Sequence, residues 1–149
     1  MLSSLPKYET SRGSGLARVL LVDDDPAARL TLKTVLETSG YRVDVAASAA
    51  EAVGMLDQAE YSLVLSDLEL ESPEAGLKVL SHARIASYQP ATALITAESE
   101  QSARRAKSAA RSLLIKPEDI PGLLSKVASL ISERATRRLR RELRLASAH

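Results

Sequence analysis

Short, predominantly apolar runs recur along this chain and constrain its fold more strongly than any other feature. Four runs have the length and composition of strands covered on both faces: residues 17–22, 61–66, 91–96 and 112–115. Residues 41–46 (YRVDVA) alternate instead, as a strand nearer the edge of a sheet does. Helical patterns separate these five segments. The alternation predicts an α/β protein with a parallel sheet, right-handed crossovers and helices on both faces.

The helices are predicted from their start and stop signals and from their apolar faces. Asp25 followed by Pro26 is typical of a helix start, and Gly40 is typical of a helix end. Further helices are expected around residues 49–56, after a loop that contains Pro73 and Gly76, around residues 99–109, and from residues 119–121 onward.

Length and composition exclude several classes of function. The 149 residues fit one compact domain with some residues left over. The absence of cysteine excludes a disulfide framework and a cysteine nucleophile, and the two histidines, His82 and His149, are too scattered for a zinc site. No segment has the apolar length of a signal peptide or a membrane span, so we expect a cytoplasmic protein without a membrane partner.

Five polar residues stand where the buried runs end: Asp23, Asp24, Asp67, Thr96 and Lys116. Because the carboxyl ends of parallel strands meet at one edge of a sheet, these residues are expected to lie close together. Carboxylates, a hydroxyl and an amine in one place suit a hard divalent cation and a phosphoryl group. One carboxylate would then be left to act as a nucleophile.

A simpler interpretation exists for each acidic residue alone. The run from Asp23 to Asp25 could merely cap the helix that follows, and Asp67 could be a turn residue. The combination favours a site, because acids at two strand ends and the amine of Lys116 at another compensate one another's charge.

The chain also resembles a known family, the receiver domain of bacterial two-component response regulators. The matching segments are LLVDDDP at 20–26, AASAAEAV at 46–53, LVLSDLEL at 63–70, LITA at 94–97 and LLIKP at 113–117. The resemblance covers roughly residues 17–132. It implies a doubly wound, CheY-like fold whose five parallel strands have the order 2-1-3-4-5.

The resemblance implies a role for each residue of the site. Asp67 would be the phosphoacceptor, taking a phosphoryl group from a sensor histidine kinase or a phosphotransfer protein. Asp24, Asp67 and the backbone carbonyl of Glu69 would bind Mg²⁺ or Mn²⁺, and Asp23 would act mainly through a bound water. Such a chain would catalyse only transfer to, and hydrolysis from, its own aspartate, and it would not be an enzyme acting on other substrates.

The remaining roles concern the phosphoryl group and its lifetime. By the same resemblance, Lys116 and Thr96 would stabilise the phosphoryl oxygens, and the Lys116–Pro117 bond would be cis. Glu69 and Glu98 stand two residues beyond Asp67 and Thr96, at positions that tune hydrolysis in similar domains.

The chain departs from the family at the position that commonly carries the signal outward. Leu113, three residues before Lys116, stands where many receivers have Tyr or Phe. Leucine has no hydroxyl to turn inward or outward, so we expect an atypical switch and an unusual output.

Residues 133–149 form a second anomaly, an arginine-rich segment with a net charge of +4 in a chain of net charge +1. We therefore divide the chain into a flexible leader (1–16), a receiver domain (17–132) and a basic helical extension (133–149). Apolar residues continue into the extension at spacings of three and four: Ala128, Ile131, Ala135, Leu139, Leu143 and Ala146.

Three interpretations of this extension remain open. Residues 119–146 could dock a partner or self-associate, the arginines could contact nucleic acid, or the segment could be a solvated tail without function. Nucleic acid is disfavoured, because the segment has no aromatic residues and no DNA-binding fold beside it.

The leading functional hypothesis is a stand-alone receiver that signals through a downstream protein target. One alternative is a degenerate receiver that binds partners without phosphorylation. A haloacid-dehalogenase-like phosphatase is disfavoured, because that family places its nucleophile after the first strand and uses a cap domain.

Overall fold

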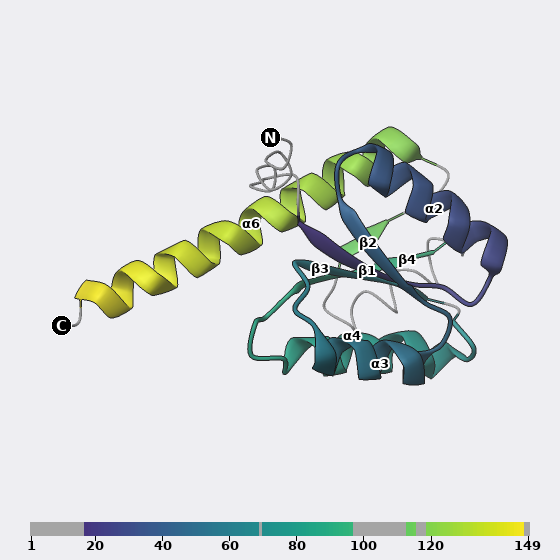
Figure 1. The fold of residues 1–149 in the computed structure, drawn as a ribbon, viewed down its shortest axis with the longest axis horizontal. Helices are drawn as coiled ribbons and strands as arrows, with labels where there is room; N and C mark the ends of the chain where they lie inside the picture. Colours follow the sequence, from purple (N-terminus) through teal and green to yellow (C-terminus); the bar gives the residue numbers. More distant parts are fainter. Residues whose placement is uncertain (1–16, 69, 97–112, 116–118, 148–149) are drawn as a thin grey trace, which may run out of the picture.

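A parallel β-sheet lies at the centre of the molecule, between two layers of helices (Figure 1). The computed structural model describes residues 17–68, 70–96, 113–115 and 119–147. Its strands are β1 (Arg18–Val22), β2 (Arg42–Ala46), β3 (Leu63–Asp67), β4 (Ala91–Ile95) and β5 (Leu113–Ile115). Its helices are α2 (Pro26–Thr38), α3 (Ala49–Gln58), α4 (Pro73–Arg84) and α6 (Ile120–Ser147). The predicted α/β class is confirmed.

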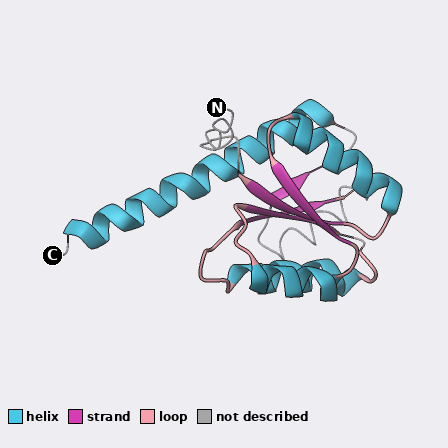
Figure 2. Ribbon diagram, viewed as in Figure 1, coloured by secondary structure: helices cyan, strands magenta, loops and turns pink. Residues whose placement is uncertain are grey.

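The strands are parallel and follow the order β2-β1-β3-β4-β5. Helices α2 and α6 cover one face of the sheet, and α3 and α4 cover the other (Figure 2). Strand order reverses at β1, which lies between β2 and β3. In open α/β sheets, ligands bind beyond the carboxyl ends of the strands at such a reversal.

Two apolar cores, one on each face, hold the layers together. Side chains alternate between the faces along each strand, so that neighbouring residues of β1 enter different cores. Leu20 and Val22 pack toward α3 and α4, whereas Val19 and Leu21 pack toward α2 and α6. The four side chains are fully buried, which explains why the strand reads as an uninterrupted apolar run.

Helix α4 begins earlier than the sequence predicts. Pro73 and Gly76 were expected in a loop, but Pro73 is the first helical residue and Gly76 lies in the first turn. Proline is well tolerated there because the first helical N–H has no partner within the helix. The helix expected around residues 99–109 and the Lys116–Pro117 bond lie outside the described residues.

Helix α6 runs without interruption for 28 residues, as the spacing of apolar residues predicts. At 1.5 Å per residue it is about 42 Å long. Leu123 and Val127 in its first half are buried against the sheet. Its second half extends away from the sheet (Figure 1), and the large apolar side chains Leu139 and Leu143 are more than half exposed there.

A buried arginine fixes α6 to the body of the domain. Arg134 is 8% exposed, and its guanidinium donates hydrogen bonds to the carbonyl oxygens of Tyr88 (2.7 Å) and Gln89 (3.0 Å). Gln89 has a φ of 46°, a left-handed conformation in the turn that precedes β4. About two turns further along α6, Arg141 donates to the side-chain oxygen of Gln89 at 3.2 Å.

Candidate functional site: an acidic cluster at the carboxyl edge of the sheet

The parallel register brings three predicted site residues to one edge of the sheet. Asp23 follows β1 directly, Asp67 is the last residue of β3, and Thr96 follows β4. Asp67 pairs with Ile95, the residue before Thr96. The sequence prediction that these strand ends converge is therefore confirmed for β1, β3 and β4.

The carboxylates of Asp23, Asp24 and Asp67 form a compact cluster. One oxygen from each lies within 4.8 Å of the others. The three differ in exposure, since Asp23 is buried, Asp67 is intermediate and Asp24 is exposed. The cluster thus has one buried wall and one side open to solvent.

Asp23 is held at the buried side of the cluster. Its Oδ1 accepts a hydrogen bond from the N–H of Asp25 at 3.0 Å, and its own carbonyl accepts one from Arg29 at 2.9 Å. Burial raises the pKa of Asp23 to about 6, and the negative charges of Asp67 and Asp24 add to the rise against the opposing backbone hydrogen bond.

Helix capping accounts for only one member of the run 23–25. Asp25 is the N-cap of α2, and its carboxylate accepts a hydrogen bond from the N–H of Ala27 at 3.3 Å. Asp24 is instead part of the cluster with Asp67. The simpler interpretation, in which all three acids serve as caps, therefore does not fit the geometry.

The acidic cluster suits a small hydrated divalent cation. Three carboxylates this close repel one another, and a shared Mg²⁺ is the ordinary way to compensate them. Mg²⁺ keeps several waters and uses one or two carboxylates directly, so ligand oxygens spread over a few ångströms are compatible with it. Asp23, Asp24 and Asp67 would hold the ion.

Gly76 supports the site in a way that the sequence did not reveal. A Cβ at this position would lie 2.6 Å from the backbone oxygen of Asp67 and 3.5 Å from Oγ of the buried Ser66. Glycine therefore allows α4 to pack directly against the end of β3. The sequence predicts a loop at Gly76 and therefore does not show this packing role.

Of the other predicted residues, the structure describes Thr96 and Leu113 but not the remaining three. Thr96 is 2% exposed at the end of β4, and Leu113 is the first residue of β5, where it pairs with Ala93. The structure does not describe Glu69, Glu98 or Lys116, so their predicted roles are untested.

Comparison with known proteins identifies the family. The profile of the response regulator receiver domain matches residues 19–128. Among solved structures, a CheY-like response regulator receiver protein from Methanospirillum hungatei JF-1 has a TM-score of 0.72 and 26% identity, over 82% of this chain and 98% of that one. The chain therefore belongs to the response regulator receiver domain family.

A second solved structure is relevant to the acidic cluster. The response regulator TrrA from Thermotoga maritima was determined in complex with Mg²⁺ and a beryllium fluoride. It matches 76% of this chain and 98% of its own, with 32% identity and a TM-score of 0.65.

Curated relatives are longer than this chain. The transcriptional regulatory protein TrcR of Mycobacterium tuberculosis is 29% identical over 133 residues, which is 88% of this chain and 51% of TrcR. PmrA of Pectobacterium parmentieri, also a transcriptional regulatory protein, is 34% identical over 116 residues, 76% of this chain and 52% of PmrA. The chain thus spans about half the length of these relatives.

None of the helices that the structure describes has the length and apolar composition needed to cross a membrane. The longest, α6, carries too many arginines.

Proposed function

We propose that this chain is a phosphorylation switch, in which Asp67 accepts a phosphoryl group from a sensor histidine kinase or a phosphotransfer protein. The observation that carries the proposal is the cluster of three carboxylates at the carboxyl edge of the sheet. Family membership and the likeness to a relative determined with Mg²⁺ and a beryllium fluoride support it.

In the proposed reaction, a carboxylate oxygen of Asp67 attacks the phosphorus of a phosphohistidine. The new O–P bond forms as the P–N bond breaks, and the histidine nitrogen keeps the electron pair of that bond. The resemblance to the receiver family favours Asp67 as the nucleophile, and Asp23 is less suited because it is buried and accepts a hydrogen bond from the N–H of Asp25. The carboxylates of Asp23 and Asp24 would remain available to bind the cation.

Asp23, Asp24 and Asp67 would hold Mg²⁺, which would supply positive charge to compensate the phosphoryl oxygens. Thr96 lies at the neighbouring strand end, and its hydroxyl would donate a hydrogen bond to the aspartyl phosphate. Lys116 would pair with another phosphoryl oxygen. The carbonyl of Glu69 would be a further ligand of the cation.

The signal would end by hydrolysis of the aspartyl phosphate. Water attacks the phosphorus, inorganic phosphate leaves, and the Asp67 carboxylate is restored. Glu69 and Glu98 would flank the attacking water. Neutral substitution of both should change the dephosphorylation rate, and an unchanged rate would contradict that assignment.

The proposed output differs from that of receivers with an aromatic switch residue. Leu113 has no hydroxyl, so it would not report phosphorylation by rotating a tyrosine-like side chain. We propose that the division into leader (1–16), receiver (17–132) and extension (133–149) is functional, with the downstream protein target contacting the extension. The N-terminal half of α6 packs on the same sheet that carries Asp67 and Thr96.

Phosphorylation can be tested with a small-molecule donor. The chain is incubated with acetyl phosphate and MgCl₂, and the intact mass is measured over time. We expect a labile adduct that forms in the wild type, is lost over time by hydrolysis as an acyl phosphate is, and is absent in Asp67→Ala and after addition of EDTA.

Asp25→Ala is the matched control, because this acid caps α2 and lies beside the cluster without belonging to it. It should retain the adduct. Absence of an adduct in the wild type would favour the alternative, a degenerate receiver that binds partners without phosphorylation.

A further inference from the structure

The outer half of α6 exposes an apolar stripe that nothing in the described structure covers. The stripe consists of Ala135, Leu139, Leu143 and Ala146, which recur at spacings of four and three and so share one face of the helix. Leu139 is 56% exposed and Leu143 is 58% exposed. A solvated helix tail has no physical need for leucines at these positions, so the stripe indicates a contact surface.

This surface is held in place before any partner arrives. Arg134 ties α6 to the carbonyls of Tyr88 and Gln89, and Arg141 ties the following turns to the Gln89 side chain. A segment that is already helical and oriented loses less conformational entropy on binding than a free tail does. The extension is therefore suited to docking.

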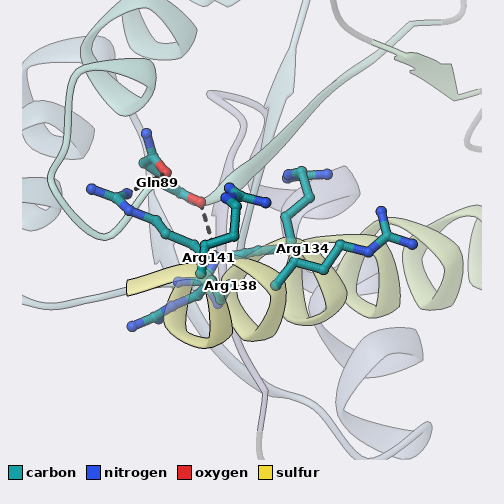
Figure 3. A pocket seen from close by; sticks show the side chains of 7 residues that line it. Gln89, Arg134, Arg138 and Arg141 are labelled. Atoms are coloured by element: carbon teal, nitrogen blue, oxygen red, sulfur yellow. Dashed lines mark hydrogen bonds between the residues drawn. The ribbon is translucent and has the colours of Figure 1, made fainter. Parts of the chain in front are cut away.

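Arginines cover the rest of the outer half of α6, and Arg138 and Arg140 flank the stripe, about 100° around the helix on either side of Leu139. A cleft of about 280 Å³ beside Gln89 is lined by six arginines (Figure 3): Arg134, Arg137, Arg138, Arg140, Arg141 and Arg144. Arg137, Arg138, Arg140 and Arg144 make no ion pair or hydrogen bond with any described residue. Residues 133–147 hold six arginines and two glutamates, a net charge of +4, and contain no lysine.

This charge identifies the occupant of the stripe. Pairing residues 133–147 of two copies would bring +4 against +4, so self-association along this part of α6 is opposed electrostatically. Arginine, in contrast, forms two-pronged hydrogen bonds with carboxylates. The combination of an apolar stripe and flanking guanidiniums fits an amphipathic helix whose polar positions carry Asp and Glu.

Nucleic acid and lipid surfaces fit less well. A phosphate backbone would satisfy the arginines but leave Leu139 and Leu143 exposed. A membrane surface helix normally uses bulky aromatic or leucine-rich faces, whereas half of this stripe is alanine.

We propose that the outer half of α6 is the docking surface for an acidic amphipathic helix of a partner protein. Leu139 and Leu143 contact the partner's apolar face, and Arg138 and Arg140, which flank Leu139 on α6, bind its carboxylates. This inference rests on the part of the proposed function in which a downstream target contacts the extension, and it names the contact surface and the chemistry of that target; peptide binding to α6 is measured independently of phosphorylation at Asp67.

The test uses the full chain and a defined probe. The probe is a fluorescent three-heptad peptide with leucine at positions a and d and glutamate at e and g, and a matched peptide has lysine at e and g. Binding is followed by anisotropy at low and high salt. We expect binding of the acidic peptide alone, weakened by salt and by about tenfold or more in the double variant Leu139→Ser/Leu143→Ser.

Further variants separate charge from apolar contact. Arg138→Gln/Arg140→Gln should weaken binding and reduce its salt dependence, whereas Leu30→Ser should have no effect, because Leu30 is an exposed leucine on α2 (65%). Circular dichroism checks that each variant keeps its helix content. Three results would overturn the proposal: equal binding of the lysine peptide, binding of duplex DNA or anionic vesicles but not of the acidic peptide, or self-association that the leucine variants abolish.

Discussion

The guanidinium of Arg134 lies 2.7 Å from the carbonyl oxygen of Tyr88, a residue 46 positions earlier in the chain. This contact joins the middle of α6 to the turn that leads into β4. Burial, and then the neighbouring charges of Arg138 and Arg137, lower the pKa of Arg134. The side chain is buried with other positive charges beside it, and its hydrogen bonds to two backbone carbonyls compensate part of that cost.

Replacing Arg134 should therefore loosen α6. Arg134→Ala leaves the carbonyls of Tyr88 and Gln89 without their donor, which we expect to lower the free energy of unfolding by about 2 kcal/mol. Urea denaturation measures the change, and limited proteolysis should show faster cleavage within α6. Arg140→Ala is the control, because Arg140 is exposed and should change stability by less than about 0.5 kcal/mol. Equal losses in both variants would show that Arg134 is not an anchor.

Two glycines give a matched pair of predictions about helix packing. A methyl group at Gly76 would meet the Asp67 carbonyl at 2.6 Å, so Gly76→Ala should destabilise the protein by about 1–3 kcal/mol. Gly54 in α3 has no atom within 4 Å of such a methyl group, so Gly54→Ala should stabilise it by about 0.5–1 kcal/mol. Thermal unfolding measures whether the first substitution lowers the stability and the second raises it.

The same Gly76→Ala variant tests the link between packing and site. Because the displaced atom is the carbonyl of Asp67, the carboxylate cluster should also be disturbed. We expect slower adduct formation with acetyl phosphate in Gly76→Ala and an unchanged rate in Gly54→Ala. Wild-type rates in both variants would mean that the site tolerates movement of the end of β3.

Sequence patterns predicted the sheet well because of how its strands are buried. β1, β3 and β4 are covered on both faces, so each is a continuous apolar run that ends where polar residues begin. Parallel topology then requires those polar ends to meet, which is why Asp23, Asp67 and Thr96 could be grouped before the structure was known.

The features that sequence reasoning missed depend on distances between segments. The sequence predicts a loop at Gly76, because nothing in it shows that α4 passes against the Asp67 carbonyl. The burial of Arg134 is not predicted by the sequence, because a basic run usually lies at the surface. One signal was present: Arg134 stands seven residues after the buried Val127 and so lies on the same face of α6.

Asp44 on β2 should contribute to stability in a pH-dependent way. Partial burial alone would raise its pKa, but hydrogen bonds from Tyr61 (2.8 Å) and Arg18 (3.0 Å) prevail, and the pKa of Asp44 is lowered. A carboxyl whose pKa is lower in the folded state stabilises the protein above its unfolded pKa, and this contribution disappears as pH falls through the folded value.

Asp44→Asn should therefore flatten the acid side of the stability profile. Stability of the wild type should fall more steeply than that of Asp44→Asn as pH drops below about 4. Tyr61→Phe removes one of the two donors and should give an intermediate slope. Denaturant midpoints measured across this pH range provide the check, and parallel profiles for all three proteins would contradict the prediction.

The contribution of Asp23 to stability should have the opposite pH dependence to that of Asp44. Asp23 should also couple folding to the binding of Mg²⁺. Its pKa is raised from 3.8 to about 6, first by burial and then by the charges of Asp67 and Asp24. A carboxyl whose pKa is higher in the folded state favours folding at low pH, and this contribution is lost as pH rises from 3.8 through about 6. Above that range, Asp23 is ionised and repels the other carboxylates of the metal-free cluster. A bound cation should reduce this repulsion.

We therefore expect MgCl₂ to raise the melting temperature more at pH 8 than at pH 5, and EDTA to reverse the effect. Asp23→Asn should stabilise the metal-free protein at pH 8, because one buried charge is removed, and should reduce the gain from Mg²⁺. Asp25→Asn is the control, since this residue caps α2 and an asparagine also caps helices well. A shift with Mg²⁺ that is equal at both pH values, or equal in Asp23→Asn and the wild type, would show that Asp23 does not couple cation binding to stability.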